Sequence, residues 1–139
     1  MVARTTITVC TTCSFGPDEK LRDGLTGGET LAGFVEDAAR AQDALAVRRH
    51  ACLMGCKSHC AVAISAPAKM TYVLGRFEPG AAAASAIVDY AALYADSIDG
   101  VVSYRSWPDG VKGHFLARVP PLPAETAADV PAGGDRKDR

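Results

Sequence analysis

The five cysteines of this 139-residue chain fall in two short stretches and are the residues with the clearest capacity for chemistry. Cys10 and Cys13 form a C-x-x-C pair in VCTTC, and Cys52, Cys56 and Cys60 recur at every fourth position in CLMGCKSHC. Clustered thiols in a reducing compartment more often bind metal or do redox chemistry than form structural disulfides. The odd number also fits a complete disulfide framework poorly. The cysteines therefore favour a metal site or a redox site.

The composition is that of an ordinary globular domain. Apolar residues make up 48% and charged residues 22% of the chain, and the formal net charge is −1, so no general attraction to nucleic acid or to an anionic membrane is expected. No apolar run approaches the length that crosses a bilayer, and the first residues lack the pattern of a secretory signal. We expect a cytoplasmic protein whose partners include neither nucleic acid nor a membrane.

Hydrophobic periodicity predicts the order β-α-β, then the second cysteine stretch, then β-β-α. A βαβ unit needs a parallel pair of strands with a crossover helix, whereas the later hairpin adds antiparallel strands. We therefore predict an α/β, thioredoxin-like fold with a small mixed four-stranded sheet and two main helices. The expected strands are 5–10, 44–50, 61–65 and 70–77, and the expected helices run over 29–42 and onward from 78–80.

The predicted domain spans residues 1–120. Residues 121–139 carry almost no large apolar side chain after Pro123 and are expected to form a disordered C-terminal tail.

This order of elements predicts where the cysteines meet. Cys10 ends the first strand, while Cys52 and Cys56 follow the second strand. The carboxyl ends of two parallel neighbouring strands lie side by side, where open α/β sheets bind their ligands. A C-x-x-C pair followed much later by a close cysteine pair is also typical of a metal site, so we predict a four-sulfur site of Cys10, Cys13, Cys52 and Cys56. Zinc and an iron–sulfur cluster both accept four thiolates, and the apolar residues and glycine around the second stretch favour a cluster slightly.

Two other interpretations of the cysteines remain open. The second stretch could be a helix with three cysteines on one buried face, although Gly55 and Ser58 make that helix less stable. Cys10 and Cys13 could be a thioredoxin-type redox pair, although they precede a glycine-proline loop instead of opening a helix. His59 lies inside the second stretch, but an isolated histidine is more often structural than a ligand.

The residues from Cys52 to the second predicted helix resemble the second half of the thioredoxin-like 2Fe–2S ferredoxins and the matching subunit of respiratory NADH dehydrogenases. Cys52, Gly55 and Cys56 match the C-x-x-x-C motif of that superfamily, Tyr72 matches its aromatic strand, and Cys10 matches its first ligand.

The chain through ARVPP is also similar to a bacterial family of small predicted metal-binding proteins of unknown function, with VCTTC, CLxxCxxxC and ARVPP as its features. Members of that family are often encoded near cobalamin-synthesis genes.

The chain departs from the ferredoxin pattern at two cysteines. The second ligand of the ferredoxins follows several residues further along the loop than Cys13 does, and the position of Cys60 is commonly proline. Cys60 is therefore an alternate ligand that could replace Cys13.

The resemblance implies an electron carrier and not an enzyme. It predicts a ferredoxin-like protein that binds a 2Fe–2S cluster through Cys10, Cys13, Cys52 and Cys56 and passes single electrons to a redox partner protein. The alternative is a non-redox metal-binding protein that holds zinc, or handles cobalt in cobalamin metabolism together with a metal-handling protein. A third option is a thiol–disulfide enzyme using Cys10 and Cys13. Ferredoxin relatives often dimerise, so the resemblance also allows a homodimer.

Overall fold

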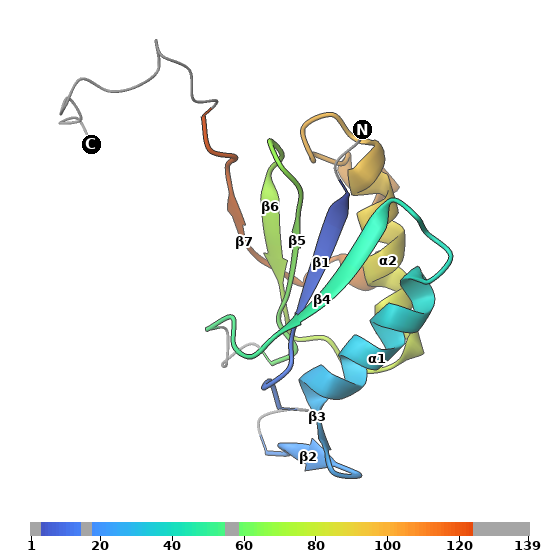
Figure 1. The fold of residues 1–139 in the computed structure, drawn as a ribbon, viewed down its shortest axis with the longest axis vertical. Coiled ribbons are helices and arrows are strands. Elements are labelled where there is room, and N and C mark those ends of the chain that lie inside the picture. The colour runs from blue at the N-terminus through green and yellow to red at the C-terminus, as the bar shows by residue number, and fades with distance from the viewer. Residues whose placement is uncertain (1–3, 15–17, 55–58, 124–139) are drawn as a thin grey trace, which may run out of the picture.

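The structure is a computed structural model that describes residues 4–14, 18–54 and 59–123. Five strands form one mixed sheet in the order β4-β1-β5-β6-β7 (Figure 1). The predicted α/β fold with a mixed sheet and two main helices is confirmed, but the prediction of four strands was wrong because a fifth strand joins the sheet. The strands are β1 Thr5–Cys10, β4 Leu45–His50, β5 Val62–Ser65, β6 Thr71–Leu74 and β7 Phe115–Val119.

The parallel pair of the βαβ unit lies at one side of the sheet. β1 and β4 run parallel with Cys10 opposite His50, and β1 also pairs antiparallel with β5. Ile7 and Val9 point into the core because side chains alternate between the faces of a strand. Thr8 lies on the opposite face, where its hydroxyl accepts a hydrogen bond of 3.0 Å from Arg48 Nε. The predicted parallel pairing of the first two long strands is therefore confirmed.

Two helices cover one face of the sheet, as Figure 1 shows. Helix α1 spans Gly27–Ala39 and helix α2 spans Ala81–Asp96. Thr26 caps α1 in a capping box with Glu29, which fixes the first turn of that helix. Burial of the apolar stripe of each helix against the sheet forms the main core.

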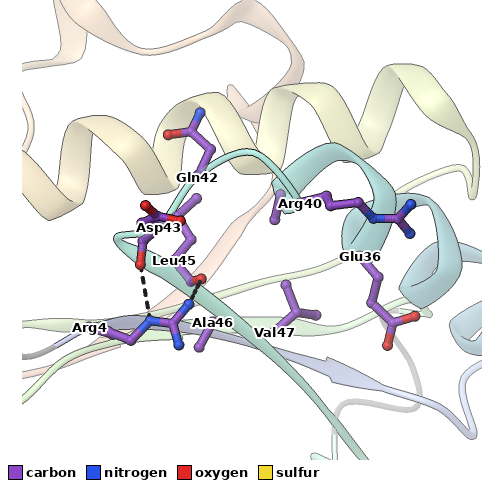
Figure 2. Close-up of a pocket in the computed structure, with 9 residues that line it drawn as sticks. Arg4, Glu36, Arg40, Gln42, Asp43, Leu45, Ala46 and Val47 are labelled. Atoms are coloured by element: carbon purple, nitrogen blue, oxygen red, sulfur yellow. Dashed lines mark hydrogen bonds between the residues drawn. The ribbon is translucent and has the colours of Figure 1, made fainter.

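Arg4 ties the start of β1 to the connection between α1 and β4 (Figure 2). Its guanidinium donates hydrogen bonds to the carbonyl oxygens of Asp43 at 3.1 Å and Leu45 at 2.7 Å. Together with Glu36 and Arg40 these residues line a hollow of about 320 Å³. The hollow lies at the amino-terminal ends of β1 and β4, at the opposite end of these strands from Cys10.

The segment after α2 ends in a strand that the sequence did not reveal. Glycine and proline divide it, and the structure forms two 3₁₀ turns, Tyr104–Ser106 and Asp109–Val111, before β7. Phe115 then packs against Trp107, with ring centroids 4.5 Å apart, and lies edge-on to Tyr72 at 5.5 Å. Aromatic contacts with distant elements therefore hold this segment against the sheet.

A short hairpin lies within the segment that the sequence analysis treated as a loop. Strands β2 Leu21–Arg22 and β3 Leu25–Thr26 pair across Asp23 and Gly24, whose φ angles are 54° and 81°. Positive φ at both turn residues is the geometry for which an Asp-Gly pair is favoured.

The structure describes only part of the predicted C-terminal tail. Residues 121–123 are exposed, and residues 124–139 of the predicted tail lie outside the described residues. In the part of the chain that the structure describes, no helix is both long and apolar enough to cross a membrane.

Candidate thiol centre

The carboxyl ends of β1 and β4 bring the two cysteine stretches together. The backbone N–H of Thr11 donates to the carbonyl oxygen of His50 at 2.8 Å, and the hydroxyl of Thr12 donates to the carbonyl oxygen of Ala51. Cys10 Sγ lies 3.8 Å from the same Ala51 oxygen. The first cysteine stretch therefore lies against the residues that lead into Cys52.

Cys10 and Cys13 are buried, and each thiol shifts the pKa of the other. They pack with Ala61 and Leu53 in a small apolar cluster separate from the main core. The backbone N–H of Ala61 donates to Cys13 Sγ at 3.3 Å. Residues that follow β4 and precede β5 therefore pack around the C-x-x-C pair.

The environments of this pair shift the two thiol pKa values in opposite directions. Burial raises the pKa of Cys10, but interactions with the Thr12 hydroxyl, with Cys13 and with the backbone of Leu53 outweigh that effect and leave the pKa lowered. Burial raises the pKa of Cys13 to about 11, and the neighbouring Cys10 adds to the increase. Cys10 is therefore the thiol of the pair that ionises first.

Cys52 follows β4 and is half-buried. The backbone N–H of Met54 donates to its sulfur at 3.3 Å, and Met54 adopts a left-handed φ of 63°. A non-glycine residue in that region carries backbone strain, which is commonest at functional sites. Cys56, the fourth predicted ligand, lies outside the described residues.

Cys60 directly precedes the residues that enter β5. It is fully buried, has a left-handed φ of 58°, and its thiol donates to the carbonyl oxygen of Ser14 at 3.6 Å. Burial raises the pKa of Cys60 to about 12, and the charges of Cys13 and Cys10 add to the increase. The structure therefore places the alternate ligand beside the C-x-x-C pair.

The start of α1 packs on the C-x-x-C pair, a contact that the sequence analysis did not predict. The N–H of Gly28 donates to the carbonyl oxygen of Cys13 at 3.0 Å. A Cβ at Gly28 would lie only 1.8 Å from the carbonyl oxygen of Cys10. The side chain of Thr26 also donates to the carbonyl oxygen of Thr11. The glycine pair in LTGGET was the signal for this contact, since glycine permits close approach of two backbones.

The three histidines have different surroundings. His50 Nδ1 lies 3.1 Å from the carbonyl oxygen of Cys52, and His114 Nδ1 lies 2.9 Å from that of Gly75. Among the buried side-chain nitrogen and oxygen atoms of the described residues, two have no hydrogen-bond partner: His59 Nδ1 and the Tyr90 hydroxyl. His59 precedes Cys60 in the sequence, but among the described residues its ring forms no hydrogen bond with a sulfur atom.

Cysteine thiols that receive backbone hydrogen bonds are chemically suited to act as thiolate ligands of a metal centre. Backbone hydrogen bonds reach Cys10, Cys13 and Cys52, and such bonds stabilise thiolate ligands and tune iron–sulfur clusters. Among residues 4–14, 18–54 and 59–123, no three His, Cys, Asp or Glu side chains are gathered as a metal-binding group. Cys60 lies in the surroundings of Cys10 and Cys13, with Cys52 on the adjoining segment, but these described thiols do not themselves form a metal-binding group.

Comparisons with known proteins identify the family but no characterised relative. No curated protein and no solved structure matches the chain significantly. The model of a family described as "Protein of unknown function (DUF1636)" matches residues 7–121, which include both cysteine stretches and, apart from the first two residues of β1, the five strands of the sheet. The chain therefore belongs to the DUF1636 family.

Proposed function

We propose that this protein is a small ferredoxin-like electron carrier that holds a 2Fe–2S cluster through Cys10, Cys13, Cys52 and Cys56. The observation that carries the proposal is the pattern of hydrogen bonds to sulfur. Ala61 N–H donates to Cys13, Met54 N–H donates to Cys52, and backbone bonds reach Cys10. Thiolates need such donors because negative charge accumulates on the sulfurs of a metal centre.

The cluster would supply one-electron redox chemistry, and the chain's own residues would control its surroundings. Leu53 and Ala61 pack around Cys10 and Cys13 and keep water from their sulfurs. Met54 is exposed beside Cys52, so a partner can approach this end of the sheet closely. Lys20, whose ammonium group donates to the carbonyl oxygen of Thr12 at 2.9 Å, places positive charge on the same segment. An acidic redox partner would be attracted to it.

The proposal is tested by replacing Cys56 and Cys60 with alanine, one at a time. In protein purified without oxygen, Cys56→Ala should lose the visible absorption of the cluster, whereas Cys60→Ala should keep it. Circular dichroism would show that both variants remain folded. If Cys56→Ala keeps the visible absorption of the cluster and Cys60→Ala loses it, the proposed ligand set is wrong and Cys60 is a ligand in place of Cys56.

A second candidate is a thiol–disulfide oxidoreductase, which the C-x-x-C spacing and the opposite pKa shifts of Cys10 and Cys13 favour. The pKa of Cys10 is lowered, that of Cys13 is raised, and each thiol contributes to the shift of the other. A thiolate attacking a substrate disulfide and a neighbouring thiol resolving the mixed disulfide require such a pair. Metal-free protein would then reduce a disulfide substrate, and Cys10→Ser would abolish that activity. The electron-carrier proposal predicts no such activity.

A further inference from the structure

An apolar groove lies along β7, away from the cysteines. It has a volume of about 570 Å³, and its lining includes Val101, Tyr104, Trp107 and Phe115. The Trp107 ring stacks on Phe115 and lies 4.9 Å from the ring of Tyr104. Tyr104 is nonetheless 61% exposed and Val101 is 46% exposed. Exposed aromatic and aliphatic side chains gathered at a groove mark a surface that binds a partner.

The edge of the sheet beside this groove is available for pairing. In the described part of the chain β7 pairs only with β6, so its other edge carries no strand. Four consecutive residues from Phe115 to Arg118 line the groove, which therefore follows that edge. An unpaired edge is a template for a strand of another chain.

The residues that follow β7 have the chemistry that such a groove binds. Pro120, Pro121, Leu122 and Pro123 form a PPLP segment, and Leu122 is 90% exposed. Proline-rich segments are stiff, and aromatic-lined grooves recognise them with little loss of conformational entropy. The chain thus carries both an exposed proline-rich segment and an aromatic groove.

The segment cannot fill the groove of its own chain. It leaves the end of β7 and continues away from the sheet (Figure 1), whereas the groove runs back along β7. Prolines fix φ and hold the segment extended at about 3.1 Å per residue, so it does not reverse within four residues. The fitting occupant is the same segment of a second copy.

A two-fold symmetric arrangement allows the proline-rich segment of each copy to fill the groove of the other. Antiparallel contact of two β7 edges places the residues after one strand against the start of the other, where Phe115 lines the groove. We propose that the protein forms a symmetric dimer in which the Pro120–Pro123 segment of each copy occupies the Trp107 groove of the other.

The proposal is tested by the mass and the tryptophan emission of the full chain over a concentration series. Trp107 is the only tryptophan, so its emission reports directly on the groove. Wild-type protein should form dimers with rising concentration in sedimentation velocity, and the Trp107 emission should shift to shorter wavelength in parallel. Leu122→Asp should weaken self-association by about tenfold or more, because an anchor that the dimer buries is lost.

Ile98→Asp is the matched control. Ile98 is 95% exposed and does not line the groove, so this change should leave both the dimer and the emission shift intact. A monomeric wild type at every concentration would overturn the proposal. So would a dimer that Leu122→Asp does not weaken more than Ile98→Asp does, or a dimer without an emission shift. A shift seen only when an unrelated proline-rich peptide is added would assign the groove to a foreign partner instead.

Discussion

Three of the cysteine thiols influence one another, and each meets a different set of neighbours. Hydrogen bonds lower the pKa of Cys10 in spite of its burial, whereas burial raises the pKa of Cys13 to about 11 and that of Cys60 to about 12. Cys60 also lacks the backbone N–H donors that reach Cys10 and Cys13 among its described contacts, and its thiol donates to Ser14 instead. Cys60 is therefore the member of the group best suited to remain a neutral thiol.

The raised pKa of Cys60 makes the stability of the metal-free protein depend on pH. An unfolded cysteine loses its proton near pH 8.5, whereas folded Cys60 keeps its proton until about pH 12. Above about pH 9 the unfolded state therefore binds fewer protons than the folded state, and the free energy of unfolding falls by about 1.4 kcal/mol per pH unit for each such thiol. Below that pH the contribution is fully present.

Urea unfolding at a series of pH values checks this prediction. Between about pH 9 and about pH 11 the free energy of unfolding should fall less steeply in Cys60→Ala than in the wild type, by the contribution of one titrating thiol. Between about pH 6 and about pH 8 the free energies of unfolding of the two proteins should change with pH in the same way. An equal slope in the two proteins above pH 9 would show that Cys60 is not a protonated buried thiol.

Among the elements, the first turn of α1 is the one that braces the thiol centre. Gly28 bonds to the carbonyl oxygen of Cys13 and leaves no room for a side chain against Cys10. Thr26 both caps the helix and bonds to the backbone of Thr11. The helix therefore supports the cysteines through their backbone, while their sulfurs stay turned toward other groups.

Gly28→Ala should destabilise the protein by about 2 kcal/mol or more, because the added Cβ would overlap the Cys10 carbonyl and push α1 away. Gly33→Ala in the same helix is the control. A Cβ at Gly33 meets no atom within 4 Å, so this change should stabilise the helix by about 0.5 to 1 kcal/mol. Thermal or urea unfolding of the two variants makes the comparison. Equal stability of Gly28→Ala and wild type would contradict the close packing.

Elements with strong periodicity were predictable from sequence, and elements held by distant contacts were not. Alternation in TTITVC and the apolar stripe around Leu31 and Val35 predicted β1 and α1 to within a few residues. β7 was missed because its position depends on Phe115 packing against Trp107 and Tyr72. The β2–β3 hairpin was missed although its Asp23-Gly24 turn carried a recognisable signal.

The candidate site shows the same division. The strand order predicted that Cys10 would meet the residues around Cys52, because parallel neighbours end at the same edge of a sheet. The burial of Cys60 beside Cys13 depends on the left-handed backbone conformation of Cys60, which no sequence pattern predicts. The hydrogen bonds from Ala61 and Met54 to sulfur are likewise backbone contacts that side-chain identity does not encode.

In the whole molecule, the thiol centre and the Trp107 groove occupy separate places on one sheet. The cysteines lie around the carboxyl ends of β1 and β4, while the groove follows β7 at the opposite side of the five-stranded sheet. Both helices cover one face, and the centre lies at the end of the strands (Figure 1). A redox partner and a second copy could therefore be bound at the same time.

The metal and sulfide content of protein purified without oxygen tests the central proposal most directly. The electron-carrier proposal predicts about two irons and two acid-labile sulfides per chain, with visible absorption that bleaches on reduction. Cys10→Ala should lose both, since Cys10 lies among the sulfur donors at the end of β1. A colourless protein that holds one tightly bound zinc, or one that holds no metal and reduces disulfides, would contradict the account.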